Sequence, residues 1–91
     1  MDAADRLAEI ERRLQAAFSP ESLLVEDESH LHAGHAGARD GRGHFRVSIV
    51  AEAFEELNPV ARHRAVYQAM GELMQTDIHA LSIEALGSSE L

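Results

Sequence analysis

The sequence predicts an α+β domain with the order helix, strand, strand, helix, strand (α-β-β-α-β). Residues 2–18 and 58–74 carry apolar side chains at the three- and four-residue steps of a helix. Residues 44–50 alternate between apolar and polar side chains, as a half-buried antiparallel strand does. Because the chain has 91 residues and no cysteine, we expect residues 1–91 to form a single small domain without disulfides.

The first helix is expected over residues 2–18. Acidic residues at its start suit the positive end of the helix dipole. The pair Ser19-Pro20 ends the helix, because the residue before a proline avoids the helical conformation. One apolar stripe runs along this helix and predicts packing in a core; it consists of Leu7, Ile10, Leu14 and Phe18.

A long loop separates the first two predicted strands. Residues 22–28 hold a short apolar run followed by acidic side chains, and residues 44–50 place Phe45, Val47 and Ile49 on one face. The loop between them, residues 29–43, is longer than an ordinary hairpin connection. We expect such a loop to be mobile or functional.

The second helix is predicted to run from Asn58-Pro59 to about Met74, since asparagine caps free amides and proline fits the first helical position. Gly71 inside it marks close packing or an early fray. The last strand is expected over residues 78–86, where His79 shares the sequence parity of the apolar positions, and residues 87–91 are expected to be a loose tail.

Composition argues against several classes of function. Sixteen acidic residues against eight basic ones, all arginine, give a net charge of −8, which disfavours nucleic-acid binding. No stretch approaches the roughly 20 apolar residues of a membrane span, and the acidic N-terminus does not look like a signal peptide, so we expect a cytoplasmic protein. The sequence contains no evident nucleophile–base pair or carboxylate dyad, so we expect no enzyme activity and no small-molecule substrate.

Histidines are the candidate functional residues. His30, His32 and His35 lie in the glycine-rich loop, and His79 lies far downstream. Histidine is the commonest metal ligand, and a chain without cysteine must bind metal through histidine, carboxylate or a partner's ligands. A histidine-only site for zinc, nickel or copper is one interpretation, although this spacing is permissive. We interpret His44 as a sheet-surface residue or a support for the loop.

Four motifs at these spacings resemble the BolA family over nearly the whole chain. The resemblance implies a class II KH-like fold, with a three-stranded mixed sheet and helices packed on one face. The motifs are Asp27-Glu28-Ser29, Gly43-His44-Phe45-Arg46-Val47, Arg62-His63-Arg64 with Val66-Tyr67, and Ile78-His79-Ala80-Leu81-Ser82-Ile83.

The resemblance also implies a function. BolA-like proteins form heterodimers with monothiol glutaredoxins and share a bridging 2Fe–2S cluster that glutathione also ligates, in iron–sulfur cluster assembly, trafficking and iron regulation. Carried onto this sequence, the metal ligands are His79 and the histidine three residues after Ser29, which is His32. His35 and His30 are the alternative loop ligands. Histidine ligation of one iron is known from Rieske-type centres.

A KH-like nucleic-acid-binding transcriptional regulator is the alternative function. Residues 34–37 match the GxxG pattern that clamps a nucleotide backbone in KH domains, and Arg39, Arg42 and Arg46 lie near it. In KH domains this motif joins two helices, whereas here it lies between two predicted strands. Together with the net charge, this ranks nucleic-acid binding second.

Overall fold

A computed structural model describes residues 1–32 and 41–91, with residues 31 and 32 described in their backbone only. The elements follow the predicted order, with short helical turns added between them. They are α1 (Ala3–Phe18), β1 (Ser22–Asp27), η1 (Ser29–His32), β2 (Gly43–Val50), η3 (Glu52–Phe54), α2 (Pro59–Met70), α3 (Leu73–Thr76), β3 (Ile78–Leu86) and η4 (Ser88–Glu90).

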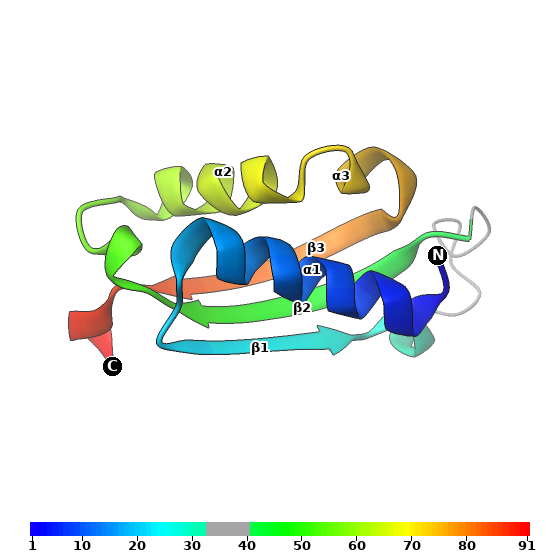
Figure 1. Cartoon of the computed structure of the whole chain (residues 1–91), viewed down its shortest axis with the longest axis horizontal. Coiled ribbons are helices and arrows are strands. Elements are labelled where there is room, and N and C mark those ends of the chain that lie inside the picture. Colours follow the sequence, from blue (N-terminus) through cyan, green and yellow to red (C-terminus); the bar gives the residue numbers. More distant parts are fainter. Residues whose placement is uncertain (33–40) are drawn as a thin grey trace.

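The three strands form one mixed sheet in the order β1-β2-β3. β1 pairs with β2 in the antiparallel sense, and β2 pairs with β3 in the parallel sense. Both α1 and α2 cover the same face of this sheet (Figure 1). The mixed sheet and the one-sided helix layer confirm the predicted fold class.

The core lies between the helices and the covered face of the sheet. The central strand β2 contributes alternate residues, as its sequence pattern predicts, and the predicted stripe of α1 supplies Ile10 and Leu14. The rings of Phe18, at the end of α1, and Phe54, in η3, pack against each other with 4.8 Å between their centroids. The largest fully buried side chains belong to Phe45, Phe54, Ile10, Leu14, Ile49, Met70, Ile78, Val47 and Val66.

The second helix ends earlier than the sequence predicts. Asn58 caps α2 by accepting a hydrogen bond from the Ala61 amide, as expected. The helix then stops at Met70, because Gly71 adopts φ +57°, a conformation that residues with a Cβ rarely take. The prediction of one helix to Met74 is therefore wrong: the chain forms a separate short helix, α3.

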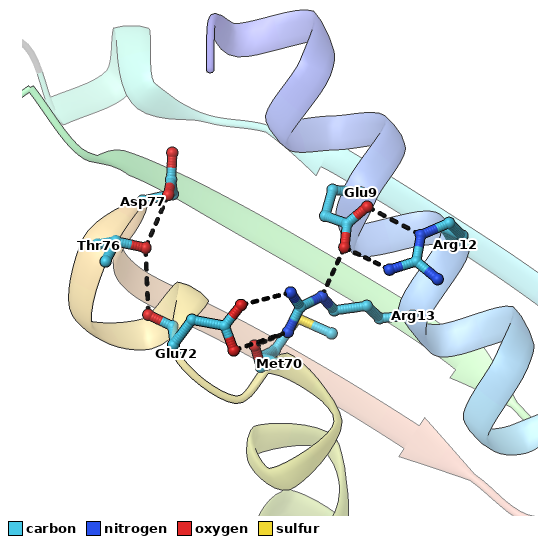
Figure 2. Close-up of polar contacts among 7 residues, drawn as sticks. All are labelled: Glu9, Arg12, Arg13, Met70, Glu72, Thr76 and Asp77. Carbon is cyan, nitrogen blue, oxygen red and sulfur yellow. Dashed lines mark hydrogen bonds and ion pairs between the residues drawn. The ribbon is translucent and has the colours of Figure 1, made fainter.

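Arg13 connects α1 to the break between α2 and α3. Its guanidinium donates hydrogen bonds to the Met70 carbonyl at 2.6 Å, to Glu72 at 2.7 Å and to Glu9 at 2.8 Å (Figure 2). Hydrogen bonds from Arg12 and Arg13 lower the pKa of Glu9 to about 2. The carbonyl that the end of α2 leaves without a helical partner is thus paired by a side chain of α1.

Charged side chains form hydrogen bonds and ion pairs at the end of the sheet where β2 and β3 finish. We call this region the tail end; it consists of Glu55, Arg62, Ala85, Ser89 and Glu90. Arg62 is only 8% exposed and donates to the Ala85 carbonyl at 3.0 Å, while it also pairs with Glu90 at 2.6 Å. The backbone amide and the hydroxyl of Ser89 donate to the Glu55 carboxylate. Residues 88–90, in the tail predicted to be loose, therefore form a short helix with partners in the rest of the domain.

Candidate functional site

The opposite end of the sheet, where β2 and β3 begin, gathers two histidines; we call it the histidine end, defined by Ser29, Arg42, His44, Asp77 and His79. It lies at the end of the sheet where β1 passes into η1 and β2 begins (Figure 1). At this end Gly43 pairs with Ile78, whereas His44 pairs with Ala80. His79 is therefore the extra residue of a β-bulge in β3.

The bulge exposes His79. Ile78 is fully buried and Leu81 is 8% exposed, so both point into the core although they are three residues apart. His79 and Ala80 lie between them and are both exposed. The sequence parity that groups His79 with the apolar positions is therefore interrupted here, because one extra residue in a strand reverses the facing of the residues before it. The bulge is what turns this imidazole outward.

His44 packs beside His79. The two ring centroids lie 5.1 Å apart with 43° between the ring planes. His44 is 8% exposed, so its interpretation as a surface residue is wrong. The His44 backbone amide donates to the Ser29 hydroxyl at 3.1 Å, and Ser29 opens η1. Because this bond involves no side-chain atom of His44, the interpretation of the histidine as a support for the loop stays a prediction.

Arg42 contacts the His79 ring directly. Its Nη2 lies 3.1 Å from His79 Nδ1, and its Nη1 lies 3.5 Å from the Gln75 carbonyl oxygen. A guanidinium has donors and no acceptor, so Nδ1 must accept this hydrogen bond. The sequence predicts Arg42 only as part of a basic cluster. Its place just before Gly43, where the paired strands begin, is the signal that puts it near His79.

Two contacts, one from β2 and one from α1, fix the turn that precedes His79. The Gly43 amide donates to the Asp77 carbonyl at 2.9 Å, and Arg6 of α1 pairs with the Asp77 carboxylate at 3.0 Å. Hydrogen bonds from Thr76 and then from Arg6 lower the pKa of Asp77. The sequence gives no sign of the Arg6 contact, because 71 residues separate the two partners. These contacts fix the position from which His79 projects.

Glycine is the one residue type that fits at position 43, where β2 begins. A Cβ on Gly43 would lie 2.5 Å and 2.8 Å from two ring atoms of Phe45, and 3.2 Å from the Ser29 hydroxyl oxygen. Phe45 is 2% exposed, so its ring has no room to withdraw. The glycine therefore lets η1, β2 and the core ring approach one another closely at the histidine end.

The loop histidines are described only in part. His30 is exposed in η1, His32 is the last residue of η1 with its side chain outside the described part, and His35 lies outside the described residues altogether. The GxxG residues 34–37 also lie outside. Among the residues that are described, no group of three or more histidines, cysteines or carboxylates could hold a metal ion. His32, and His30 and His35 as alternatives, stay predictions.

His63 is also exposed and lies on α2. His63 lines a shallow groove of about 300 Å³ on α2, whose walls are almost entirely apolar. The groove is formed by Pro59, Val60, His63, Arg64 and Tyr67. None of the helices in the described part of the chain is long and apolar enough to cross a membrane.

The chain is similar to known proteins over most of its length. Residues 14–90 match the family model for BolA-like proteins. "Protein BOLA1, chloroplastic" of Arabidopsis thaliana is 43% identical over 89 residues, which cover 94% of this chain and 56% of that protein. The chain thus spans about half the length of this relative.

Further relatives agree in fold and sequence. The solved "BolA domain of SufE1 from Arabidopsis thaliana" superposes with a TM-score of 0.85 and 34% identity, over 100% of this chain and 99% of that chain. The "DNA-binding transcriptional regulator BolA" of Haemophilus influenzae is 36% identical over 81 residues, covering 89% of this chain and 76% of that protein. The sheet, the motif residues and these matches agree: the chain belongs to the BolA family.

Proposed function

We propose that this chain is a non-enzymatic partner of a monothiol glutaredoxin and shares a bridging 2Fe–2S cluster with it. In this proposal His79 supplies one ligand and a loop histidine, His32 before His35 or His30, supplies the other. The glutaredoxin and glutathione supply thiolates, which this cysteine-free chain lacks. The role is iron–sulfur cluster assembly or trafficking, with a link to iron regulation, in the cytoplasm.

One observation carries the proposal: an exposed imidazole on a β-bulge stands at the end of the sheet from which the histidine-rich loop departs. A continuous set of contacts leads from the loop to this ring. Ser29, at the start of η1, bonds to the His44 amide, and the His44 ring packs at 5.1 Å from that of His79. Exposure suits a ligand that another protein completes, because the ring is open to an approaching surface.

The donor set suits an iron–sulfur cluster that is shared. When bound, the cluster supplies one-electron redox chemistry, and imidazole ligation raises its reduction potential above that of all-cysteine clusters. The chain's own contribution is to hold His79 outward. The bulge sets the direction of the ring, His44 packs against one side of it, and the turn at Asp77 anchors the strand below it.

The proposal is tested by reconstituting the cluster with a monothiol glutaredoxin and glutathione and recording its visible absorption and circular dichroism. We expect His79→Ala to abolish or shift the spectrum. His63→Ala, which changes an exposed histidine on α2, is the matched control and leaves the spectrum unchanged. An unaltered spectrum for His79→Ala contradicts the assignment of His79.

The same assay tests which loop histidine ligates. We expect His32→Ala to change the spectrum more than His30→Ala or His35→Ala. Equal effects of all three substitutions contradict the choice of His32 and favour a loop in which the imidazoles exchange with one another.

DNA binding is the second candidate function, favoured by the name of the Haemophilus influenzae relative. The charges argue against it. At least four of the eight arginines are paired with carboxylates of the chain and are less available to phosphates; these are Arg6, Arg12, Arg13 and Arg62. Binding of the isolated chain to duplex DNA that weakens steeply with salt, without retention by a glutaredoxin, would replace the first proposal with this one.

A further inference from the structure

The contact between Arg42 and His79 is unusual for a histidine that ligates metal. Metal-binding histidines almost always donate their second ring nitrogen to a carboxylate, a carbonyl or water. In this chain the neighbour of Nδ1 is a guanidinium, which can only donate, at 3.1 Å. The contact at Nδ1 is therefore the reverse of the one usually found at occupied metal sites.

This contact and metal ligation exclude each other through either nitrogen. If Nδ1 is to bind metal, Arg42 occupies the lone pair that the metal needs. If Nε2 is to bind metal, the neutral ring must carry its hydrogen on Nδ1, and Nδ1 can then no longer accept from Arg42. With the Arg42 hydrogen bond in place, the hydrogen lies on Nε2 and neither nitrogen is a ligand.

We infer that Arg42 holds His79 in a non-ligating state in the free chain and has to leave the imidazole before His79 binds metal. This rests on the proposed role of His79 as a ligand. The Arg42–His79 contact is exposed, and the Gln75 carbonyl lies 3.5 Å from Arg42 Nη1, so an acceptor stays close when the His79 contact breaks. As a consequence, His79 binds free metal cations only weakly until a partner displaces the Arg42 guanidinium from the ring.

The position of the ring hydrogen is the direct test. The imidazole nitrogen shifts of His79 are measured by NMR in the isolated chain, at one fixed pH at which the ring is neutral. In the unchanged chain we expect the hydrogen on Nε2 and an accepting Nδ1. Arg42→Glu supplies a carboxylate acceptor, so we expect the hydrogen to move to Nδ1. Arg64→Glu makes the same change of charge at an exposed position of α2, and we expect it to leave the His79 hydrogen on Nε2. Identical His79 shifts in Arg42→Glu and the unchanged chain overturn the inference.

Zinc binding gives a second readout. We expect Arg42→Gln to bind Zn²⁺ about tenfold more tightly than the unchanged chain, in the range found for residues that orient metal-binding histidines. Arg64→Gln is the control for lost charge. When His79 is already replaced by alanine, Arg42→Gln should change the affinity for Zn²⁺ no more than Arg64→Gln does. A gain that persists without His79 overturns the inference.

These measurements separate this inference from the proposed function. The NMR and zinc experiments use the isolated chain and need neither glutaredoxin nor cluster. If they succeed while no cluster forms with a glutaredoxin, the proposed function fails and the role of Arg42 stands. If a cluster forms through His79 but its ring shifts ignore Arg42, the reverse holds.

Discussion

The two ends of the sheet use arginine in opposite ways. At the tail end Arg62 is buried and meets acceptors only, namely the carbonyls of Leu57 and Ala85 and the carboxylate of Glu90. At the histidine end Arg42 lies against an exposed imidazole, in a hydrogen bond that solvent can replace at little cost. The comparison separates a buried set of hydrogen bonds, whose loss should cost stability, from an exposed contact, whose loss should cost less.

The largest expected effect is at the tail end. Arg62→Ala leaves the Leu57 and Ala85 carbonyls without this donor and removes the partner of Glu90, so we expect a loss of about 2–3 kcal/mol in unfolding free energy. Urea denaturation measures it. Glu90→Gln, which removes only the exposed partner, is expected to cost much less. Equal losses for the two variants would mean that the buried carbonyls do not depend on Arg62.

The two ends can also be compared through their glycines. Gly43→Ala places a Cβ against the buried Phe45 ring, so we expect a loss of about 1–3 kcal/mol and displaced amide NMR signals of His44 and His79. Gly87→Ala at the tail end places a Cβ 2.9 Å from the Glu55 carboxylate and 3.1 Å from the Glu55 Cα, and the carboxylate would have to shift against its hydrogen bonds from Ser89. We expect a smaller loss than for Gly43→Ala, because the Glu55 side chain is only half-buried whereas the Phe45 ring is packed in the core. A larger loss for Gly87→Ala would contradict this account of the close packing around Gly43.

Between the ends, the hydrogen bonds of Arg13 test whether α1 depends on the break after α2. We expect Arg13→Ala to lower the unfolding free energy by about 1–2 kcal/mol, because the Met70 carbonyl loses its donor (Figure 2). Arg12→Ala is the matched control on the same helix, since its contact is an exposed pair with Glu9. If both variants were equally stable, the link between α1 and α2 would contribute nothing.

Acid should weaken both ends. Hydrogen bonds from Arg62 lower the pKa of Glu90, and those from Thr76 and Arg6 lower the pKa of Asp77. A carboxyl group with a lowered folded-state pKa stabilises the fold above its unfolded pKa and loses that effect as pH falls toward the folded value. We therefore expect stability to decline below the ordinary values of 4.5 for Glu90 and 3.8 for Asp77. Urea unfolding at several pH values should show a shallower decline in Glu90→Gln.

The smallest expected effect on stability comes from His79. Because its side chain is exposed, His79→Ala should change the unfolding free energy by less than about 0.5 kcal/mol, as surface substitutions usually do. His44→Ala, which removes a buried ring, is expected to cost about 1–3 kcal/mol. A large loss for His79→Ala in urea denaturation would make this residue part of the scaffold and remove the contrast between the two ends.

Local patterns in the sequence predict most of the fold. The stripe of α1, the alternation of β2 and the Asn58-Pro59 start of α2 each depend on neighbouring residues, and each is confirmed. The early end of α2 depends on the sign of φ at Gly71, for which the sequence pattern leaves two interpretations. The order of the strands and the helix-covered face follow from the family resemblance.

The candidate site is less predictable, because it depends on contacts between distant residues. The motif names His79 as a candidate ligand, which stays a prediction, whereas its exposure depends on a bulge that shows only in the pairing with β2. The burial of His44 and the Arg42 contact arise from that same pairing. The Arg6–Asp77 pair joins the first helix to the last turn and has no local signature.

The bulge at His79 is one residue more than a regular strand needs at this point. Ile78 and Leu81 both face the interior with two outward residues between them, whereas strict alternation requires only one. Deleting His79 would restore the regular pairing of Gly43 with Ile78 and of His44 with Ala80, so both apolar anchors would still face inward. Shortening the segment by this one residue should therefore preserve the fold while removing the outward histidine.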